Sequence, residues 1–103
     1  MKRFDVCPAR GMGIRGKDRL VVILQHEHFD DFDTILVAPL YGINDLPKFE
    51  HFRPEIKIGR TRYVIVVDRL AAIAKSKLGA PLGSAALLHF ELLRATDRLF
   101  SGF

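Results

Sequence analysis

The sequence predicts a mainly β protein, a small and partly open antiparallel barrel with one α-helix at its C-terminal end. Short apolar runs separated by glycines and prolines occupy the chain up to Gly79, which is the pattern of strands and turns. A helical period of apolar residues appears only after Pro81. A doubly wound fold would need helices between the strands, and a sandwich would usually contain more strands.

The size and composition indicate a single globular unit. The chain has 103 residues, of which 49% are hydrophobic and 27% charged, so residues 1–103 are expected to form one domain without metals or disulfides. The single Cys7 cannot form an internal disulfide, which favours a cytoplasmic setting. No apolar run approaches the roughly 20 residues of a membrane span, so no membrane association is expected.

The strand signals come in short segments. Strands are expected over residues 4–7, 20–24 and 34–38, the first and third of them ended by Pro8 and Pro39. Two further runs, 55–58 and 63–67, flank a glycine-containing loop over 59–62 and predict a hairpin. A helical turn is expected over 68–73 and a short edge strand over 75–78. Residues 10–18 and 41–53 are expected to be loops.

The C-terminal segment is predicted to be an amphipathic helix that begins after an N-cap at Ser84 and ends at a C-cap at Gly102. Seven apolar residues form the expected buried face, four at helical spacing and three that widen it: Leu88, Leu92, Ala95 and Leu99, with Leu87, Phe90 and Leu93. Such a helix would present the last residues of the chain on a rigid support.

Several residue patterns resemble enzyme sites but lack the sequence context that such sites require. Residues 11–16 match G-x-G-x-x-G but lead into a β-branched run, whereas a dinucleotide site needs a helix there. The acidic segment around His26 lacks a metal-site spacing; its potential ligands are His26, His28, Asp30, Asp31 and Asp33. Cys7 is expected to be a small buried hydrophobe. We therefore expect no catalytic residues, no cofactor and no metal.

Basic residues give a net charge of +4 and gather around two loops. The first group is Arg10, Arg15, Lys17 and Arg19; the second is Lys57, Arg60, Arg62 and Arg69. A nucleic-acid site would interleave such cations with aromatics, and only Tyr63 is near in sequence. This pattern favours a solvated basic surface, and no direct nucleic-acid substrate is expected.

The order of these segments resembles the CcdB family of plasmid-borne toxins. The matching features are a hydrophobic strand ending at Gln25, an acidic turn and a strand ending in Pro39 and Leu40. Farther on, the resemblance covers residues 54–103; its matching positions are Pro54, residues 56–59, Tyr63, Ala71, Gly79, Ala95, Phe100 and Gly102.

This resemblance implies an SH3-like antiparallel barrel of the CcdB/MazF type that forms a homodimer. It further implies a toxin that binds the DNA gyrase A subunit, traps the cleaved DNA complex without chemistry of its own, and is neutralised by an acidic CcdA-like antitoxin. The family's Trp-Gly-Ile tail maps to Ser101, Gly102 and Phe103, where only the glycine matches. Phe100 and Phe103 would supply aromatic anchors instead, and Asp97, His28 and Phe29 fall near the family's supporting contacts.

Two alternatives remain open at the level of sequence. One is a MazF-like endoribonuclease on the same scaffold, with Arg15, Arg19 and Asp68 as candidate catalytic residues. The other is a non-toxic CcdB-like binding protein that keeps only the fold and the pairing with an antitoxin.

Overall fold

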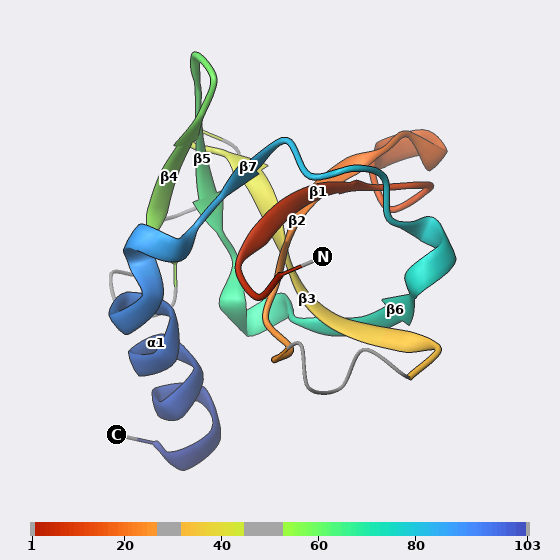
Figure 1. The fold of residues 1–103 in the computed structure, drawn as a ribbon. Helices are drawn as coiled ribbons and strands as arrows, with labels where there is room; N and C mark the ends of the chain where they lie inside the picture. The colour runs from red at the N-terminus through yellow and green to blue at the C-terminus, as the bar shows by residue number, and fades with distance from the viewer. Residues whose placement is uncertain (1, 27–31, 45–52, 103) are drawn as a thin grey trace.

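The computed structural model describes residues 2–26, 32–44 and 53–102 and has the predicted architecture, a nearly closed antiparallel barrel with a helix at one side (Figure 1). Strands follow the order β4-β5-β3-β2-β1-β7, with β6 beside β3. The strands are β1 (Asp5–Ala9), β2 (Arg19–Ile23), β3 (Thr34–Gly42), β4 (Glu55–Ile58), β5 (Thr61–Ile65), β6 (Ala71–Ala74) and β7 (Gly83–Ser84). The fold class predicted from the sequence is confirmed.

Strand β3 holds the barrel together because it has three partners. Its residues 37–39 pair with β2, residues 34–37 pair with β6, and residues 40–42 pair with β5. One edge of β3 therefore pairs with β2, and the opposite edge pairs first with β6 and then with β5. Buried side chains from these strands form the main core, with Val22, Leu40 and Ile65 among its members.

Pro8 and Pro39 lie inside β1 and β3 and do not end these strands, so that part of the prediction is wrong. The Pro8 carbonyl accepts a hydrogen bond from Gly79 N at 2.8 Å, so the polar groups of Pro8 face away from β2. The Pro39 carbonyl accepts from Val66 N at 2.9 Å, at the point where β3 passes from β6 to β5. The missing N–H of each proline thus removes no bond from the ladder with β2.

The region after the hairpin also differs from the prediction. The expected helical turn is a short 3-10 helix, η3 (Val67–Arg69), and the strand β6 follows it at once. Residues 75–78, expected to be a strand, contain a second 3-10 helix, η4 (Lys75–Lys77). The alanine-rich β6 has little intrinsic strand preference, and pairing with β3 decides its conformation.

The hairpin itself is confirmed, with a tighter turn than expected. β5 begins at Thr61, which pairs with Ile58, so the connection is only Gly59 and Arg60. Gly59 has φ of 63°, a left-handed conformation that a side chain would disfavour. Residues 11–16 form a loop containing the 3-10 helix η1 (Ile14–Gly16), and β2 follows; the G-x-G-x-x-G pattern therefore does not open an α-helix.

Helix α1 (His89–Ser101) is preceded by one 3-10 turn, η5 (Ala86–Leu88). The predicted N-cap at Ser84 is wrong: the N-cap residues are Ala85 for η5 and Leu88 for α1, and neither helix has a side-chain cap. Ser84 Oγ accepts a hydrogen bond from Ala86 N at 3.1 Å in the turn that precedes η5. Leu92 and Ala95 are buried against the barrel. No helix in the described ranges is long and apolar enough to cross a membrane.

A close approach between two chain segments makes Gly79 sensitive to substitution. A Cβ at this position would lie 2.8 Å from Pro8 Cγ, within β1. We expect Gly79→Ala to lower the free energy of unfolding by about 1–3 kcal/mol, because the backbone of one segment must shift. Urea unfolding measures this, and the exposed Ala80→Ser is the control, expected to change stability by less than about 0.5 kcal/mol. An equally stable Gly79→Ala protein would contradict the prediction.

Candidate functional site

The end of α1 is the candidate site, and its helix geometry matches the prediction. Gly102 adopts φ of 78° and its N–H donates to the Arg98 carbonyl at 2.9 Å, the left-handed C-cap expected for a terminal glycine. This cap fixes the direction in which the chain leaves the helix. In Figure 1 the last turns of α1 extend beyond the barrel, so they are accessible from several sides.

The site combines one large aromatic with small and charged neighbours. Phe100 is 69% exposed, and Asp97 and Ser101 are exposed beside it on the same helix. An aromatic ring so exposed loses contact with water when a partner covers it, and this favours association. Of the seven predicted site residues, the structure thus brings together Asp97, Phe100, Ser101 and Gly102. The other three, His28, Phe29 and Phe103, lie outside the described residues.

The predicted apolar face of α1 is correct in its centre and wrong at its margins. Leu92 and Ala95 are buried and Leu88 packs on the core, as expected. Leu87 and Phe90 were expected to widen this face, yet Leu87 is fully exposed and Phe90 is 80% exposed. At about 100° per residue, Phe90 points away from Leu92 and Leu88. Leu99 lies on the predicted face but past the core, and is 37% exposed.

His89, the first residue of α1, packs against the N-terminal part of the barrel. Its ring lies half-buried, edge-on to Phe4, with 5.2 Å between ring centroids. Phe4 is a buried core residue with positive φ, so this contact joins the start of α1 to the start of β1.

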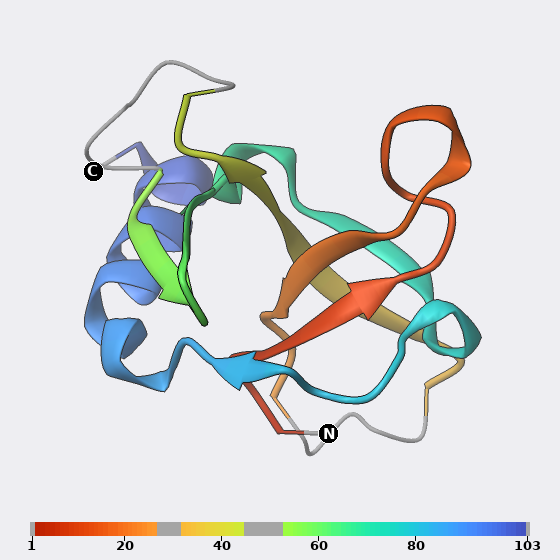
Figure 2. The ribbon, with the colours of Figure 1, turned by 90° about the horizontal axis from the view of Figure 1, so that it is seen from above.

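A second candidate surface lies beside the β1–β2 loop, on the other side of the molecule from α1 (Figure 2). A groove of about 350 Å³ there is lined by Lys17, Arg19, Leu40 and Tyr63 among others. Arg19 donates to the Leu40 carbonyl at 3.0 Å, and its guanidinium carbon lies 4.0 Å from the ring centroid of Tyr41. This groove brings the cations of Lys17 and Arg19 together with the aromatic ring of Tyr63, which lies far from them in the sequence.

Tyr41 is held from two directions. Arg69 also approaches its ring, at 5.4 Å, and donates to the Tyr41 hydroxyl at 3.2 Å. The two basic groups seen in the sequence therefore meet here through Arg19 and Arg69. Long-range pairing of β3 with β2 and β5 produces this meeting, so sequence spacing gave no signal for it.

Asp68, a candidate catalytic carboxylate, forms an ion pair with Arg53. Both nitrogens Nε and Nη2 of Arg53 donate to it, at 3.1 and 3.0 Å. The hydrogen bonds from Arg53 hold the pKa of Asp68 below its usual range. A carboxylate with a lowered pKa is a weaker general base, so this arrangement favours a structural role for Asp68.

Other reactive groups give no site within the described residues. Burial raises the pKa of the Cys7 thiol, which makes it a poor nucleophile. Among the described residues, no three His, Cys, Asp or Glu side chains lie close enough together to hold a metal ion. His28, Asp30 and Asp31 of the acidic segment lie outside them.

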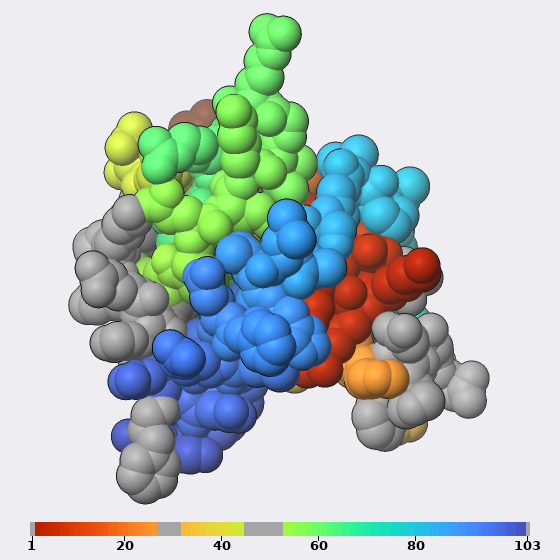
Figure 3. Space-filling model, turned by 60° about the vertical axis from the view of Figure 1, so that its left-hand side comes forward, coloured from red at the N-terminus to blue at the C-terminus, as the bar shows by residue number. Residues whose placement is uncertain are grey.

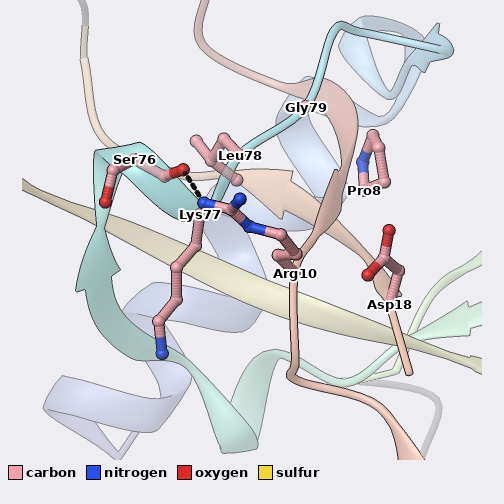
Figure 4. A pocket seen from close by; sticks show the side chains of 7 residues that line it. All are labelled: Pro8, Arg10, Asp18, Ser76, Lys77, Leu78 and Gly79. Atoms are coloured by element: carbon pink, nitrogen blue, oxygen red, sulfur yellow. Dashed lines mark hydrogen bonds between the residues drawn. The ribbon is translucent and has the colours of Figure 1, made fainter. Parts of the chain in front are cut away.

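One further hollow, of about 230 Å³, lies between β1 and η4 (Figure 4). In it the Arg10 guanidinium donates to the Ser76 carbonyl at 2.8 Å, while the Lys77 ammonium points away. The two cations thus do not converge on one ligand.

Comparison with known proteins identifies the family. The family model described as "CcdB protein" matches residues 3–102. The chain belongs to the CcdB family. CcdB-family membership makes the protein a toxin of a type II toxin–antitoxin system. Among curated proteins, no sequence matches this chain.

Solved structures with the same fold include MazF toxins. The Mycobacterium tuberculosis toxin MazF-mt6 superposes with a TM-score of 0.77 at 20% identity, over 93% of this chain and 95% of that one. A mycobacterial endoribonuclease in complex with its cognate antitoxin gives 0.77 at 13% identity, over 97% and 94%. MazE–MazF from Deinococcus radiodurans gives 0.76 at 12%, over 98% and 95%. At these identities the likeness establishes the CcdB/MazF fold alone.

Proposed function

We propose that this CcdB-family toxin acts by binding the DNA gyrase A subunit with the end of α1, trapping the cleaved DNA complex without catalysing a reaction itself. The observation that supports this proposal most is Phe100, a 69% exposed aromatic at the end of a rigid, glycine-capped helix. Aromatic residues, phenylalanine among them, are enriched at the buried centre of protein interfaces.

The proposal includes two partners within the cell. A second copy of the chain completes a symmetric homodimer, as in the family that the sequence resembles. An acidic CcdA-like antitoxin neutralises the toxin, and the net charge of +4 would accelerate their encounter. The similar solved structures include an endoribonuclease in complex with its cognate antitoxin, which supports a partner of this class.

The proposal is tested with purified protein, gyrase and supercoiled plasmid. We expect inhibition of supercoiling, accumulation of linear DNA after denaturation, and binding to a gyrase A fragment. A protein that leaves supercoiling unchanged and binds no fragment would exclude this target. If the protein also failed to arrest growth on expression but bound an antitoxin encoded by a neighbouring gene, the alternative of a non-toxic binding protein would be correct.

The groove beside Arg19 supports the ribonuclease as a second candidate. Lys17, Arg19 and Tyr63 line it, and stacking on Tyr41 orients the Arg19 guanidinium. Arg15, the other basic candidate, is exposed on the adjoining loop. The groove nevertheless lacks Asp68 among its lining residues, and that carboxylate is bound by Arg53.

Incubation with RNA separates the two candidates. We expect single-stranded RNA of mixed sequence to remain intact with the wild-type protein, because the described lining of the groove offers one carboxylate, the exposed Asp18, and no second acid or histidine to complete a general acid–base pair. Gel electrophoresis of the products measures this. Cleavage by the wild type that is lost in Arg19→Ala, with unchanged unfolding of that variant, would establish the ribonuclease instead.

A further inference from the structure

The β1–β2 loop and η4 lie at the same end of the barrel, away from α1 (Figures 1 and 2). Arg10 joins the two segments, because its backbone N–H donates to the Lys77 carbonyl and its guanidinium donates to the Ser76 carbonyl, both at 2.8 Å. The two segments therefore form one surface. We call it the loop face and define it as residues 10–18 and 75–79.

Hydrogen bonds within the β1–β2 loop define its shape. Gly13 N donates to the Lys17 carbonyl at 2.6 Å, and Lys17 N donates to the Ile14 carbonyl at 3.2 Å. The two sides of the loop approach so closely that a Cβ on Gly13 would lie 2.7 Å from the Lys17 carbonyl oxygen. The charged side chains of the loop thus project from an ordered backbone, which lowers the entropy cost of binding through them.

The loop face is strongly positive. It carries one carboxylate, the exposed Asp18, and five cations, which are the exposed Arg10, Arg15, Lys17 and Lys77 and the half-buried Lys75. Within residues 2–26, 32–44 and 53–102, none of these five cations forms an ion pair. Their charge is therefore available to an anionic partner.

The arrangement of these cations suits a polyanion better than a small anion. In the hollow between β1 and η4, the Arg10 guanidinium is bonded to a backbone carbonyl and the Lys77 ammonium points away from it (Figure 4). A small anion needs several donors aimed at one point, whereas a DNA duplex presents about one charge per 1.7 Å of its axis. Dispersed cations can each contact a different phosphate of such a backbone.

The composition of the loop face favours a duplex over a single strand. Residues 10–18 and 75–79 contain no aromatic side chain. Proteins that bind single strands combine cations with aromatics on which the bases stack. A duplex keeps its bases stacked inside and is held through its phosphates, for which cations alone suffice.

We propose that the loop face binds the phosphate backbone of double-stranded DNA without reading its sequence, as a bound partner and not as a substrate. The proposal rests on the proposed function only for the source of the duplex, which is the DNA in the cleaved gyrase complex. The loop face and the end of α1 lie at different ends of the molecule (Figure 2). One toxin thus contacts the gyrase A subunit through Phe100 and DNA through cations such as Lys17 and Lys77.

The test is binding of a short, fluorescently labelled DNA duplex of mixed sequence to the full-length protein, measured by anisotropy at increasing salt concentration. Contacts from the four exposed cations predict a slope of about −3.6 for the logarithm of the association constant against that of salt, or on the order of a hundredfold weaker binding at about 200 mM than at about 50 mM. In the double variant Lys17→Ala and Lys77→Ala, the slope should become shallower by about 2, because each lysine accounts for about one phosphate contact. Both lysines are exposed, so the variant keeps its fold.

The matched control is the double variant Lys57→Ala and Arg60→Ala on the β4–β5 hairpin. It removes the same charge from exposed positions outside the loop face. Figure 3 shows this hairpin in green, on the face of the molecule that carries the blue helix α1. We expect the control to bind the duplex with the salt slope of the wild type.

Equal salt slopes for the two double variants would overturn the proposal, because the net charge of the protein would then explain the binding. Equally tight binding of poly-glutamate or of single-stranded RNA would also overturn it, since the loop face would then not favour a duplex. The duplex assay contains no gyrase, so its outcome does not depend on the proposed target. The variant Lys17→Ala and Lys77→Ala should in turn bind a gyrase A fragment as the wild type does, which separates failure here from failure of the proposed function.

Discussion

Replacing Phe100 with alanine is expected to abolish growth arrest while leaving the fold unchanged. The ring is 69% exposed, so its removal costs little stability, but it is the largest apolar group at the end of α1. Truncating an aromatic that anchors an interface typically costs about 2 kcal/mol or more, which is about a thirtyfold loss of affinity. The measurement is binding of the variant to a gyrase A fragment, together with accumulation of cleaved DNA.

Phe90 offers a matched control on the same helix. It is an equally large aromatic, 80% exposed, and lies ten residues earlier in α1, about 15 Å along the axis. We expect Phe90→Ala to retain gyrase binding within about twofold of wild type, since a residue outside an interface has little effect on it. Equal losses of gyrase binding in both variants would indicate a general effect on α1. Unchanged binding in both would show that the end of α1 is not part of the interface.

The largest change in stability is expected from Asp68→Ala. This substitution leaves the Arg53 guanidinium, whose side chain is only 7% exposed, without its bidentate partner. Breaking a buried pair typically costs about 3–5 kcal/mol, and we expect the lower end, about 3 kcal/mol, because the Asp68 side chain is 32% exposed. Urea unfolding followed by circular dichroism measures the loss.

An exposed ion pair on the hairpin serves as the comparison. Arg62 and Glu55 are 2.7 Å apart, but the Arg62 side chain is 62% exposed, so Arg62→Ala should cost less than about 1 kcal/mol. Equal losses for the two variants would mean that burial of Arg53 does not determine the cost.

The same ion pair predicts a dependence of stability on pH. Hydrogen bonds from Arg53 lower the pKa of Asp68 in the folded protein, so the ionised carboxylate stabilises the fold. This contribution is fully present above the unfolded pKa of about 3.9 and is lost as the pH falls through the lower folded value. Asp68→Asn should therefore reduce the loss of stability on acidification below about pH 4. An unchanged acid titration would show that other carboxylates dominate it.

Local sequence determined most of the secondary structure. The β-branched run before Gln25 forms β2, the glycine turn forms the β4–β5 hairpin, and the C-terminal period forms α1 capped by Gly102. Each of these features depends on contacts between residues close in sequence, and such patterns are visible in the sequence itself. The sequence predicted the strand ends at Pro8 and Pro39 and the conformation of the alanine-rich β6 wrongly. In each case, hydrogen bonds to residues distant in the sequence determine the local structure.

Tertiary structure decided what is exposed and what lies together. The sequence by itself determined an amphipathic helix ending in a capped, aromatic tail, but packing of α1 on the barrel through Leu92 and Ala95 decided that Leu87 and Phe90 face solvent. The packing of β3 against β2 and β5 brought Arg19 and Arg69 to the ring of Tyr41. Likewise, Arg53 and Asp68 meet only in the folded chain. The amino-acid sequence fixes the chemistry of each side chain, whereas the neighbours of that side chain and its exposure to water depend on how distant strands pair.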